Sequence, residues 1–326
     1  MIHSRESGVY LDSFLAPLAP FLAETNVTDI FVNKPQEVWV ERLGGGIEKH
    51  ACPALTEPVL MRLARQIAAR SSQGISREHP LLAASLPDGA RVQIVAPPAT
   101  RGHLVMAIRK HVAAKLSLAD YAQGGAFEGL EPVVKGLDGN PGFAGVGGEE
   151  AFPLLAEAVR ERRNVLISGG TSSGKTTFLN ALLREIPEEE RLILIEDTPE
   201  LDLTHENSVG LLAARSALSE TALSAEDLLI AALRMRPDRI ILGELRGREA
   251  YTFLRTVNTG HPGSMTTIHA DSPMRAIEQL ALLVLQSGAE LRWDDVLNYV
   301  RSSIDVFVQL ERRNGQRRVT SLMVRA

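Results

Sequence analysis

One stretch of the chain has the residue types and the spacing that bind phosphate groups. It fits the pattern G-x-x-x-x-G-K-[ST], and its residues are Gly169, Gly170, Thr171, Ser172, Ser173, Gly174, Lys175 and Thr176. Such a loop presents successive backbone N–H groups, and a helix that starts there adds partial positive charge. Lys175 would reach the β- and γ-phosphates of a nucleoside triphosphate, and Thr176 would hold Mg²⁺.

The residues around this loop supply the strand–loop–helix setting that the pattern requires. The apolar run 165–167 precedes it, and apolar residues at helical spacing follow: Phe178, Leu179, Leu182 and Leu183. The alternative is a Gly/Ser turn without a ligand, which does not account for the Lys-Thr pair. We therefore expect a nucleotide to bind the residues Gly170, Thr171, Ser172, Ser173, Gly174, Lys175, Thr176 and Thr177.

An acidic block follows the next apolar run, 191–195. It contains Glu196, Asp197 and Glu200. Ligands of open parallel sheets bind at the carboxyl ends of the strands, and carboxylates there can hold Mg²⁺ and polarise an attacking water. We expect Glu196 to be catalytic and to be a metal ligand together with Thr176. A solvated acidic loop is the alternative.

A third block resembles a Walker B strand, in which an apolar run ends in acidic residues. The run 239–242 is followed by Gly243 and Glu244, so that glycine occupies the usual aspartate position. Glu244 is then the candidate that activates water. Arg246 and Arg248 come next, and both phosphate contact and ordinary surface exposure remain open for them.

Two histidines bracket a glycine-rich turn and a short strand-like run. They are His261 and His269, in the segment 256–270. Zinc binding lacks suitably grouped cysteine and carboxylate partners nearby. A polar side chain at a strand end can instead detect the loss of the γ-phosphate and shift a domain. We expect this role for one of the two histidines and assign it to His261.

Composition limits the class of protein. The chain has 326 residues, a formal net charge of −5 and 5% aromatic residues, a balance that argues against a broad nucleic-acid-binding surface. Cys52 is alone, so no disulfide framework can form within the chain. The apolar stretch 14–22 contains two prolines and is too short to span a bilayer. We expect a soluble protein whose membrane role would be peripheral or through partners.

Three regions follow from the sequence pattern. Residues 1–115 predict a mixed α/β domain with strands near 28–32, 37–41, 91–95 and 104–109 and an amphipathic helix over 58–70. Residues 116–148 are rich in glycine, which indicates a linker that contains the domain boundary, either an interdomain hinge or a disordered loop. Residues 149–326 alternate apolar strands with helices and predict a parallel sheet covered on both faces.

Local signals fix several element ends in the last region. Ser224 with Asp227 predicts a capped helix start, and Ser272 before Pro273 predicts another. Near the end of the chain, Asn314-Gly315 between two strand-like runs predicts a hairpin.

The four chemistry-bearing blocks occur in the order phosphate loop, acidic box, Gly-Glu Walker B and histidine box. This order resembles the secretion ATPases of the type II/type IV secretion superfamily. The matching strings are Glu-Asp-Thr-Pro-Glu-Leu, Gly-Glu-Leu-Arg-Gly-Arg-Glu-Ala and Thr-Gly-His-Pro-Gly-Ser…Thr-Ile-His-Ala. The compact length, without a Cys₄ zinc insertion, is most similar to the traffic ATPases of type IV secretion and conjugation. Pilus and type II secretion motors remain the nearest alternatives.

The resemblance implies a fold and a site beyond what the spacing gives. It implies an α/β protein with an N-terminal mixed α/β domain and a C-terminal RecA-like P-loop NTPase domain, with ATP and Mg²⁺ bound between them. It also implies that N-terminal arginines contact the nucleotide phosphates, and Arg91 and Arg109 stand where these are expected. Gly243 agrees with the family pattern.

The resemblance also implies a working context. Members form homohexameric rings at the cytoplasmic face of the inner membrane, peripheral to it, and work with other secretion-system ATPases and inner-membrane channel components. The leading hypothesis is an ATP-hydrolysing motor for the export of DNA or protein or for pilus biogenesis. A DNA-dependent RecA-like ATPase is less well supported, because the acidic charge balance and the few aromatics argue against a nucleic-acid track. A regulatory switch that binds ATP without hydrolysing it is the third alternative.

Overall fold

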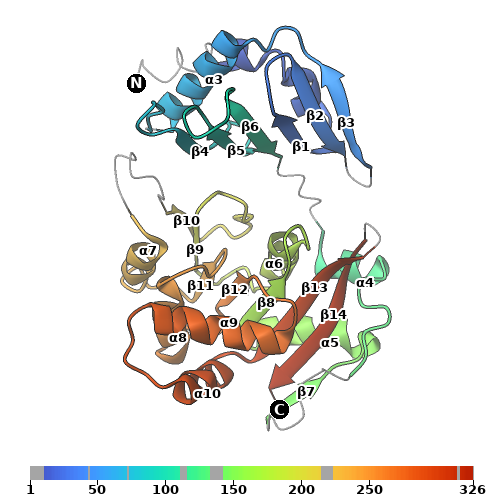
Figure 1. Ribbon diagram of the computed structural model, residues 1–326. Helices are drawn as coiled ribbons and strands as arrows, with labels where there is room; N and C mark the ends of the chain where they lie inside the picture. Colours follow the sequence, from blue (N-terminus) through green and yellow to red (C-terminus); the bar gives the residue numbers. More distant parts are fainter. Residues whose placement is uncertain are drawn as a thin grey trace. The chain divides into compact units, whose positions relative to one another are not determined.

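The computed structural model describes residues 11–42, 45–71, 73–110, 116–132, 142–213, 223–313 and 316–325. Two compact units make up the chain (Figure 1). Unit 1 covers the chain up to Val112, and unit 2 comprises Ala113–Ala213 and Leu223–Ala326. Each unit has its own hydrophobic core and is described by itself below.

Unit 1 is built on an antiparallel sheet of six strands. The strands are β1 (Val27–Val32), β2 (Glu37–Arg42), β3 (Ile47–Ala51), β4 (Leu81–Ser85), β5 (Arg91–Val95) and β6 (Val105–Arg109). Their order is β3-β2-β1-β6-β5-β4, and every pairing is antiparallel. The sequence predicted four of these strands. It missed β3, whose residues are largely exposed, and β4, whose composition is alanine-rich.

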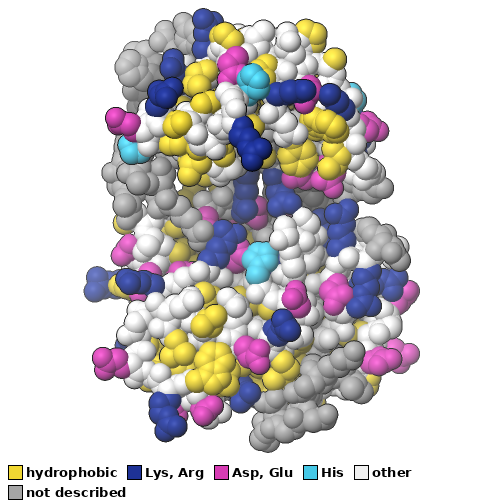
Figure 2. All heavy atoms as spheres, in the orientation of Figure 1, with side chains coloured by type: hydrophobic (Ala, Val, Ile, Leu, Met, Phe, Trp, Pro, Cys, Tyr) yellow, Lys and Arg dark blue, Asp and Glu magenta, His cyan; other side chains and the backbone are white. Residues whose placement is uncertain are grey.

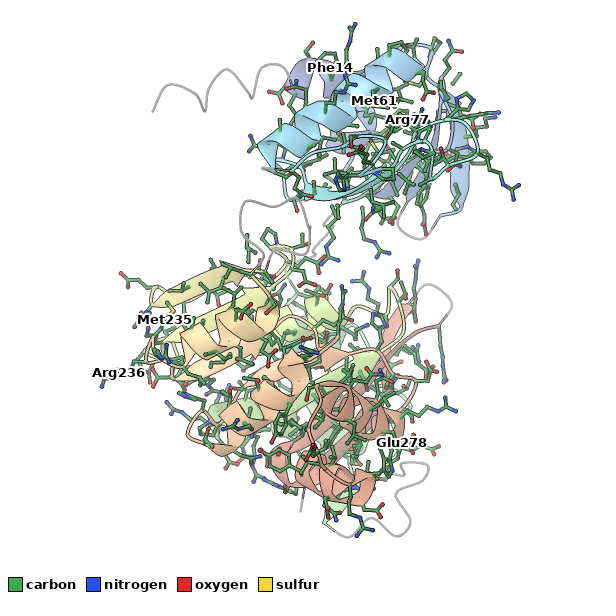
Figure 3. All side chains as sticks on the ribbon, turned by 60° about the vertical axis from the view of Figure 1, so that its left-hand side comes forward. Phe14, Met61, Arg77, Met235, Arg236 and Glu278 are labelled. Atoms are coloured by element: carbon green, nitrogen blue, oxygen red, sulfur yellow. The ribbon has the colours of Figure 1, made fainter. Side chains whose placement is uncertain are left out.

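One long helix covers the core of unit 1. Helix α3 (Glu57–Arg70) buries the apolar positions Leu60, Leu63, Ala64, Ile67 and Ala68, which recur at helical spacing. The short helix α2 (Ala19–Ala23) lies earlier in the chain. Phe14 and Met61, labelled in Figure 3, pack against the same core as partly buried side chains. The predicted amphipathic helix is therefore confirmed.

Unit 2 contains a mixed sheet of eight strands. They are β7 (Phe143–Gly145), β8 (Val165–Gly169), β9 (Leu192–Glu196), β10 (Ser208–Leu212), β11 (Arg239–Leu242), β12 (Met265–Ile268), β13 (Val306–Arg313) and β14 (Gln316–Arg325). The order is β10-β9-β11-β12-β8-β13-β14-β7. The first six strands in this order are parallel, and β14 and β7 join antiparallel. The predicted hairpin is present as β13 and β14, although its Asn-Gly turn lies outside the described residues.

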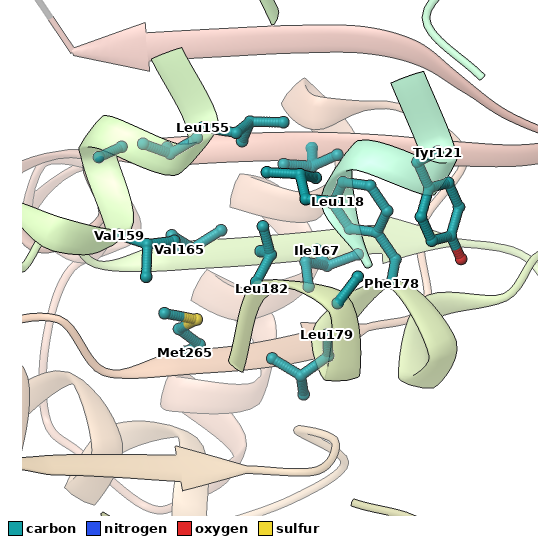
Figure 4. Close-up of a cluster of buried hydrophobic side chains, with 14 of the residues drawn as sticks. Leu118, Tyr121, Leu155, Val159, Val165, Ile167, Phe178, Leu179, Leu182 and Met265 are labelled. Atoms are coloured by element: carbon teal, nitrogen blue, oxygen red, sulfur yellow. The ribbon is translucent and has the colours of Figure 1, made fainter. Parts of the chain in front are cut away.

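Helices cover both faces of this sheet (Figure 1). Helices α4 (Leu118–Gln123), α5 (Gly148–Arg160) and α6 (Lys175–Leu183) contribute to one buried cluster. Helices α7 (Ala225–Ala232), α8 (Glu249–Asn258), α9 (Pro273–Gln286) and α10 (Trp293–Ser303) contribute to the other. Along β8, Val165 and Ile167 belong to the first cluster and Leu166 to the second, as strand alternation requires (Figure 4).

The predicted helix starts of unit 2 are confirmed. The Ser224 hydroxyl accepts a hydrogen bond from the Asp227 backbone N–H, and the Asp227 carboxylate completes a capping box. The Ser272 hydroxyl likewise accepts from the Arg275 N–H, with Pro273 at the first helical position. After α7, the chain turns at Met235 and Arg236, labelled in Figure 3, where Arg236 has a φ of 54° ahead of Pro237.

The segment 116–148 was expected to be a linker, and part of it is described by the structure. Its described residues belong to unit 2, and the buried members Leu118, Tyr121, Phe127 and Leu130 pack into the cluster under α5 and α6. Helix α4 within this segment starts at a capping box made by Ser117 and Asp120. The glycines of this segment obscured a short capped helix and its apolar face.

No helix among the described residues is long and apolar enough to cross a membrane. On the face drawn in Figure 2, acidic and basic side chains are interspersed over each unit. This mixed pattern agrees with the small net charge of the chain.

Candidate functional site

The phosphate-binding loop connects the carboxyl end of β8 to the first turn of α6. Gly174 precedes the helix with a φ of 94°, a conformation that favours glycine. Gly169 ends the strand so close to β13 that an added Cβ would lie 2.6 Å from the Leu310 carbonyl oxygen. Both glycines are therefore required by the backbone path, and the strand–loop–helix prediction is confirmed.

Lys175 opens α6 and is almost completely buried. Its ammonium donates hydrogen bonds to the carbonyl oxygens of Gly169, at 2.9 Å, and Gly170, at 3.2 Å. Burial lowers the pKa of Lys175, and the nearby Glu244 carboxylate opposes that shift. The loop thus holds the ammonium where an anion bound in the loop would meet it.

Glu244 follows β11 at the same edge of the sheet. Its carboxylate forms an ion pair with the Arg246 guanidinium, and Arg246 also reaches Asp197, with Nη1 3.4 Å from Oδ2. Arg246 therefore joins the Walker B end to the acidic box. Among the residues that the structure describes, no hydrogen bond or ion pair joins the Arg248 side chain to this group.

His269 connects Glu244 to the phosphate-binding loop. Its Nε2 lies 2.8 Å from Glu244 Oε1, and its Nδ1 lies 3.3 Å from Lys175 Nζ. Because an ammonium can only donate, Nδ1 must accept, so the proton of the neutral imidazole is on Nε2, which faces Glu244 Oε1 at ion-pair distance without forming a hydrogen bond to it. Burial and the neighbouring Lys175 charge lower the pKa of His269, which favours this neutral form.

The structure does not bring His261 to this cluster. His261 precedes β12, whereas His269 follows it, and its Nδ1 lies 3.3 Å from the carbonyl oxygen of Pro237, which precedes β11. The two histidines therefore lie at opposite edges of a parallel sheet, separated by about 13 Å of strand. The two histidines differ in their position relative to β12, and this difference can be read from the sequence.

Glu196 ends β9, next to β11, as predicted. Its carboxylate oxygen Oε2 accepts hydrogen bonds from the backbone N–H groups of Glu200, at 2.8 Å, and Leu201, at 2.9 Å. A Cβ on Gly243 would lie 3.3 Å from Glu196 Cβ, so the glycine at the usual aspartate position leaves room for this carboxylate. The observed bonds give Glu196 a role in shaping the acidic turn.

Thr176 is the second residue of α6 and stands in the phosphate-binding loop as expected. Among the described residues, no group of three or more His, Cys, Asp or Glu side chains is arranged to hold a metal ion. The candidate ligands here are the oxygen atoms of Thr176 and Glu196, and this donor set does not suit a zinc centre. It suits Mg²⁺, which is usually bound by one or two protein oxygens together with substrate phosphates.

Arg91 and Arg109 lie in unit 1, directly opposite each other on the neighbouring strands β5 and β6. Arg109 Nε donates to Asp29 Oδ1 at 3.2 Å. The antiparallel pairing thus concentrates two guanidinium groups at one place on the sheet of unit 1. The sequence predicted a role for both residues but did not predict that they lie opposite each other.

Sequence reasoning missed one further cation beside the loop. Arg317 lies on β14, and its Nη1 is 3.4 Å from the Thr177 hydroxyl. Residue type and spacing gave no signal for it, because its position depends on the pairing of β8 with the C-terminal hairpin.

Known proteins resemble this chain over nearly its full length. A family model described as "Type II/IV secretion system protein" matches residues 144–318. The "Type IV secretion system protein VirB11" of Bartonella henselae is 39% identical over 98% of this chain and 94% of its own length. The "Type IV secretion system protein PtlH homolog" of Bordetella bronchiseptica is 38% identical over 98% of this chain and 96% of its own. The crystal structure of the VirB11 ATPase of the Brucella suis type IV secretion system, in complex with sulphate, matches with a TM-score of 0.50 at 36% identity, covering 97% and 95% of the two chains.

Proposed function

Because the chain belongs to the family of type II/IV secretion system proteins, we propose that it is the ATP-hydrolysing motor of a type IV secretion system. One observation carries the proposal. The imidazole of His269 lies between Lys175 of the phosphate-binding loop and Glu244 at the end of the Walker B strand, hydrogen-bonded to the first and in close contact with the second. Such a group places a phosphate-binding cation beside a carboxylate that can activate water.

Each residue of the group has a distinct role in this proposal. Lys175 leaves the carbonyls of its own loop and binds the β- and γ-phosphates of ATP. Glu244 orients the attacking water and accepts its proton. His269, which touches both, replaces its contact with Lys175 by one with the γ-phosphate and reports the loss of that group. This sensing role was expected of His261, and the position of His269 supports His269 instead.

Mg²⁺ would be held by the Thr176 hydroxyl, with Glu196 beside it. The ion would neutralise charge on the phosphate oxygens when bound. Because Glu196 Oε2 already accepts two backbone N–H groups, the second role of Glu196 is to keep the acidic turn 197–201 in place.

The two units correspond in this proposal to the N-terminal domain, residues 1–115, and the RecA-like ATPase domain. The described contacts of residues 116–132 and 142–148 support assigning them to the second domain. Arg91 and Arg109 of the first domain contact nucleotide phosphates when six subunits form a ring. The ring works at the cytoplasmic face of the inner membrane with other secretion ATPases and channel components.

The test is steady-state phosphate release from MgATP over a range of protein concentrations, with molar mass measured in parallel by light scattering. We expect release that increases with a species of six subunits and is absent in Lys175→Ala, whose mass and circular dichroism spectrum stay those of the wild type. Equal specific activity in a monomer would contradict the ring. Undiminished release in Lys175→Ala would contradict the proposed site.

A further inference from the structure

Arg317 lies against the phosphate-binding loop. The Cβ that Gly174 lacks would lie 2.6 Å from Arg317 Cδ and 3.0 Å from Arg317 Nε. The absence of a side chain at position 174 therefore lets the arginine pass over the start of α6. Its guanidinium reaches the hydroxyl of Thr177, two residues beyond the lysine of the loop.

This guanidinium has no acidic partner among the described residues. It donates to the neutral hydroxyl of Thr177, and the phenol of Tyr121 lies close enough for the Arg317 charge to oppose the rise of the Tyr121 pKa. Burial raises the pKa of Tyr121 to about 12, and its ring packs edge-on against Phe178, at the margin of the core drawn in Figure 4. Arg317 is thus a half-buried guanidinium that donates to a neutral hydroxyl, and an anionic group would be a stronger acceptor for it.

The sheet order places Arg317 and Glu244 on opposite sides of the loop. Strand β8, which leads into the loop, lies between β12 and β13. Glu244 and His269 follow β11 and β12 on one side, and Arg317 belongs to the hairpin on the other. A chain of phosphates in the loop therefore runs from one of these groups toward the other.

The direction of that chain follows from the chemistry of its ends. Glu244 and His269 lie at the end where the γ-phosphate is cleaved, and Lys175 bridges the β- and γ-phosphates. The remaining end, at Thr177, receives the α-phosphate. We propose that Arg317 binds the α-phosphate of the nucleotide and so contributes equally to the binding of ATP and of ADP.

The inference rests on the proposed function, because it takes the direction of the triphosphate from the role of Glu244. It predicts a contact with a group that does not change during hydrolysis. The contact would therefore hold ATP and ADP with similar strength and would leave the chemical step almost unchanged.

The test compares Arg317→Ala and Arg317→Lys with Arg318→Ala. Arg318 is the neighbour on the same strand, points to the opposite face and donates to Gln316, so its removal deletes the same charge away from the loop. The measurement is the Kd for MgADP and for a non-hydrolysable Mg-ATP analogue by titration calorimetry, with kcat from phosphate release. A melting curve of each variant checks its fold.

We expect Arg317→Ala to raise both Kd values by about the same factor, at least about tenfold, because a hydrogen bond to a charged group is lost. Arg317→Lys should lose less, Arg318→Ala should match the wild type, and kcat at saturating ATP should change little. Unchanged ADP affinity in both Arg317 variants would overturn the inference. A loss confined to the ATP analogue would also overturn it, since that result would place Arg317 at the γ-phosphate.

The two proposals fail in different ways. If the wild type binds neither nucleotide, the proposed function is wrong and the inference falls with it. If the wild type binds and hydrolyses ATP while Arg317→Ala binds ADP normally, only the inference is wrong. Arg317→Lys keeps the test decisive if the alanine variant does not fold.

Discussion

The imidazole of His269 stands between Lys175 and Glu244, with Nδ1 3.3 Å from the ammonium and Nε2 2.8 Å from the carboxylate. Lys175 thus contacts the carbonyl oxygens of its own loop and the histidine. Binding of phosphate must replace these contacts. In the proposed function, the histidine can therefore respond to whether the γ-phosphate is present.

Removing the imidazole should uncouple the two ends of the group. We expect His269→Ala to lower kcat by about tenfold, the equivalent of one lost hydrogen bond, while leaving the Kd for MgADP within about twofold. His261→Ala is the matched comparison, because that ring lies at the other edge of the sheet. A larger loss of kcat in His261→Ala than in His269→Ala would return the sensing role to His261.

The pKa of His269 should depend on the charges of Lys175 and Glu244. Burial and the Lys175 charge lower its pKa, and the Glu244 charge raises it. In nucleotide-free protein we expect its NMR titration midpoint below the ordinary value of 6.5, so that the ring is neutral at pH 7. Below that midpoint the protonated ring can no longer accept from Lys175.

Two variants test the direction in which each neighbouring charge shifts the pKa of His269. Lys175→Ala removes a positive charge and should move the midpoint up, whereas Glu244→Gln removes a negative charge and should move it down. His269→Ala identifies the resonance among the eight histidines. Shifts of the same sign in both variants would contradict the bridging geometry.

Gly243 should resist replacement by the aspartate that many Walker B strands carry. An added Cβ would lie 3.3 Å from Glu196 Cβ and 3.6 Å from the Ile195 carbonyl oxygen. Gly243→Ala requires only a small shift, but the larger Gly243→Asp would force the two carboxylates together, and we expect it to lower the free energy of unfolding by about 1–3 kcal/mol. Urea unfolding of both variants measures this. Equal stability of Gly243→Asp and the wild type would show that the acidic turn adapts freely.

A buried ion pair at the other edge of the sheet should contribute strongly to the free energy of unfolding. Arg239 is fully buried and donates to both Glu190 oxygens, at 2.7 and 2.8 Å, and to the Val159 carbonyl at 2.6 Å. Arg239→Ala leaves the buried Glu190 carboxylate with the half-exposed Arg162, whose Nη2 lies 3.3 Å from Oε2, as its remaining ion-pair partner, and should cost about 3 kcal/mol of unfolding free energy. The exposed pair of Arg160 with Glu185 is the control, because Arg160→Ala should cost no more than about 1 kcal/mol. Similar losses for the two variants by denaturant unfolding would exclude a special role for the buried pair.

The parts of the fold that local signals determine could be predicted from the sequence. The run Arg239–Leu242 is a strand within the predicted bounds, and both predicted serine caps start helices. These features depend on neighbouring residues alone. The phosphate-binding loop is predictable for the same reason, since its glycines, lysine and flanking elements are contiguous.

The contacts that depend on strand order could not be predicted. Arg317 reaches the loop only because β13 pairs with β8 and β14 follows β13. The choice between His261 and His269 was within reach, because the rule that placed Glu196 at a carboxyl strand end also favours His269. In the glycine-rich segment, Ser117 with Asp120 was the missed sign of a helix.

The measurement that tests the account most directly is single-turnover ATP hydrolysis with enzyme in excess, for the wild type and Glu244→Gln. Since a positioned general base contributes at least about 100-fold, we expect the variant to bind ATP with wild-type affinity and to cleave it at least about 100-fold more slowly. Cleavage at the wild-type rate, with ATP bound normally, would contradict the assignment of Glu244 and with it the hydrolytic site described above.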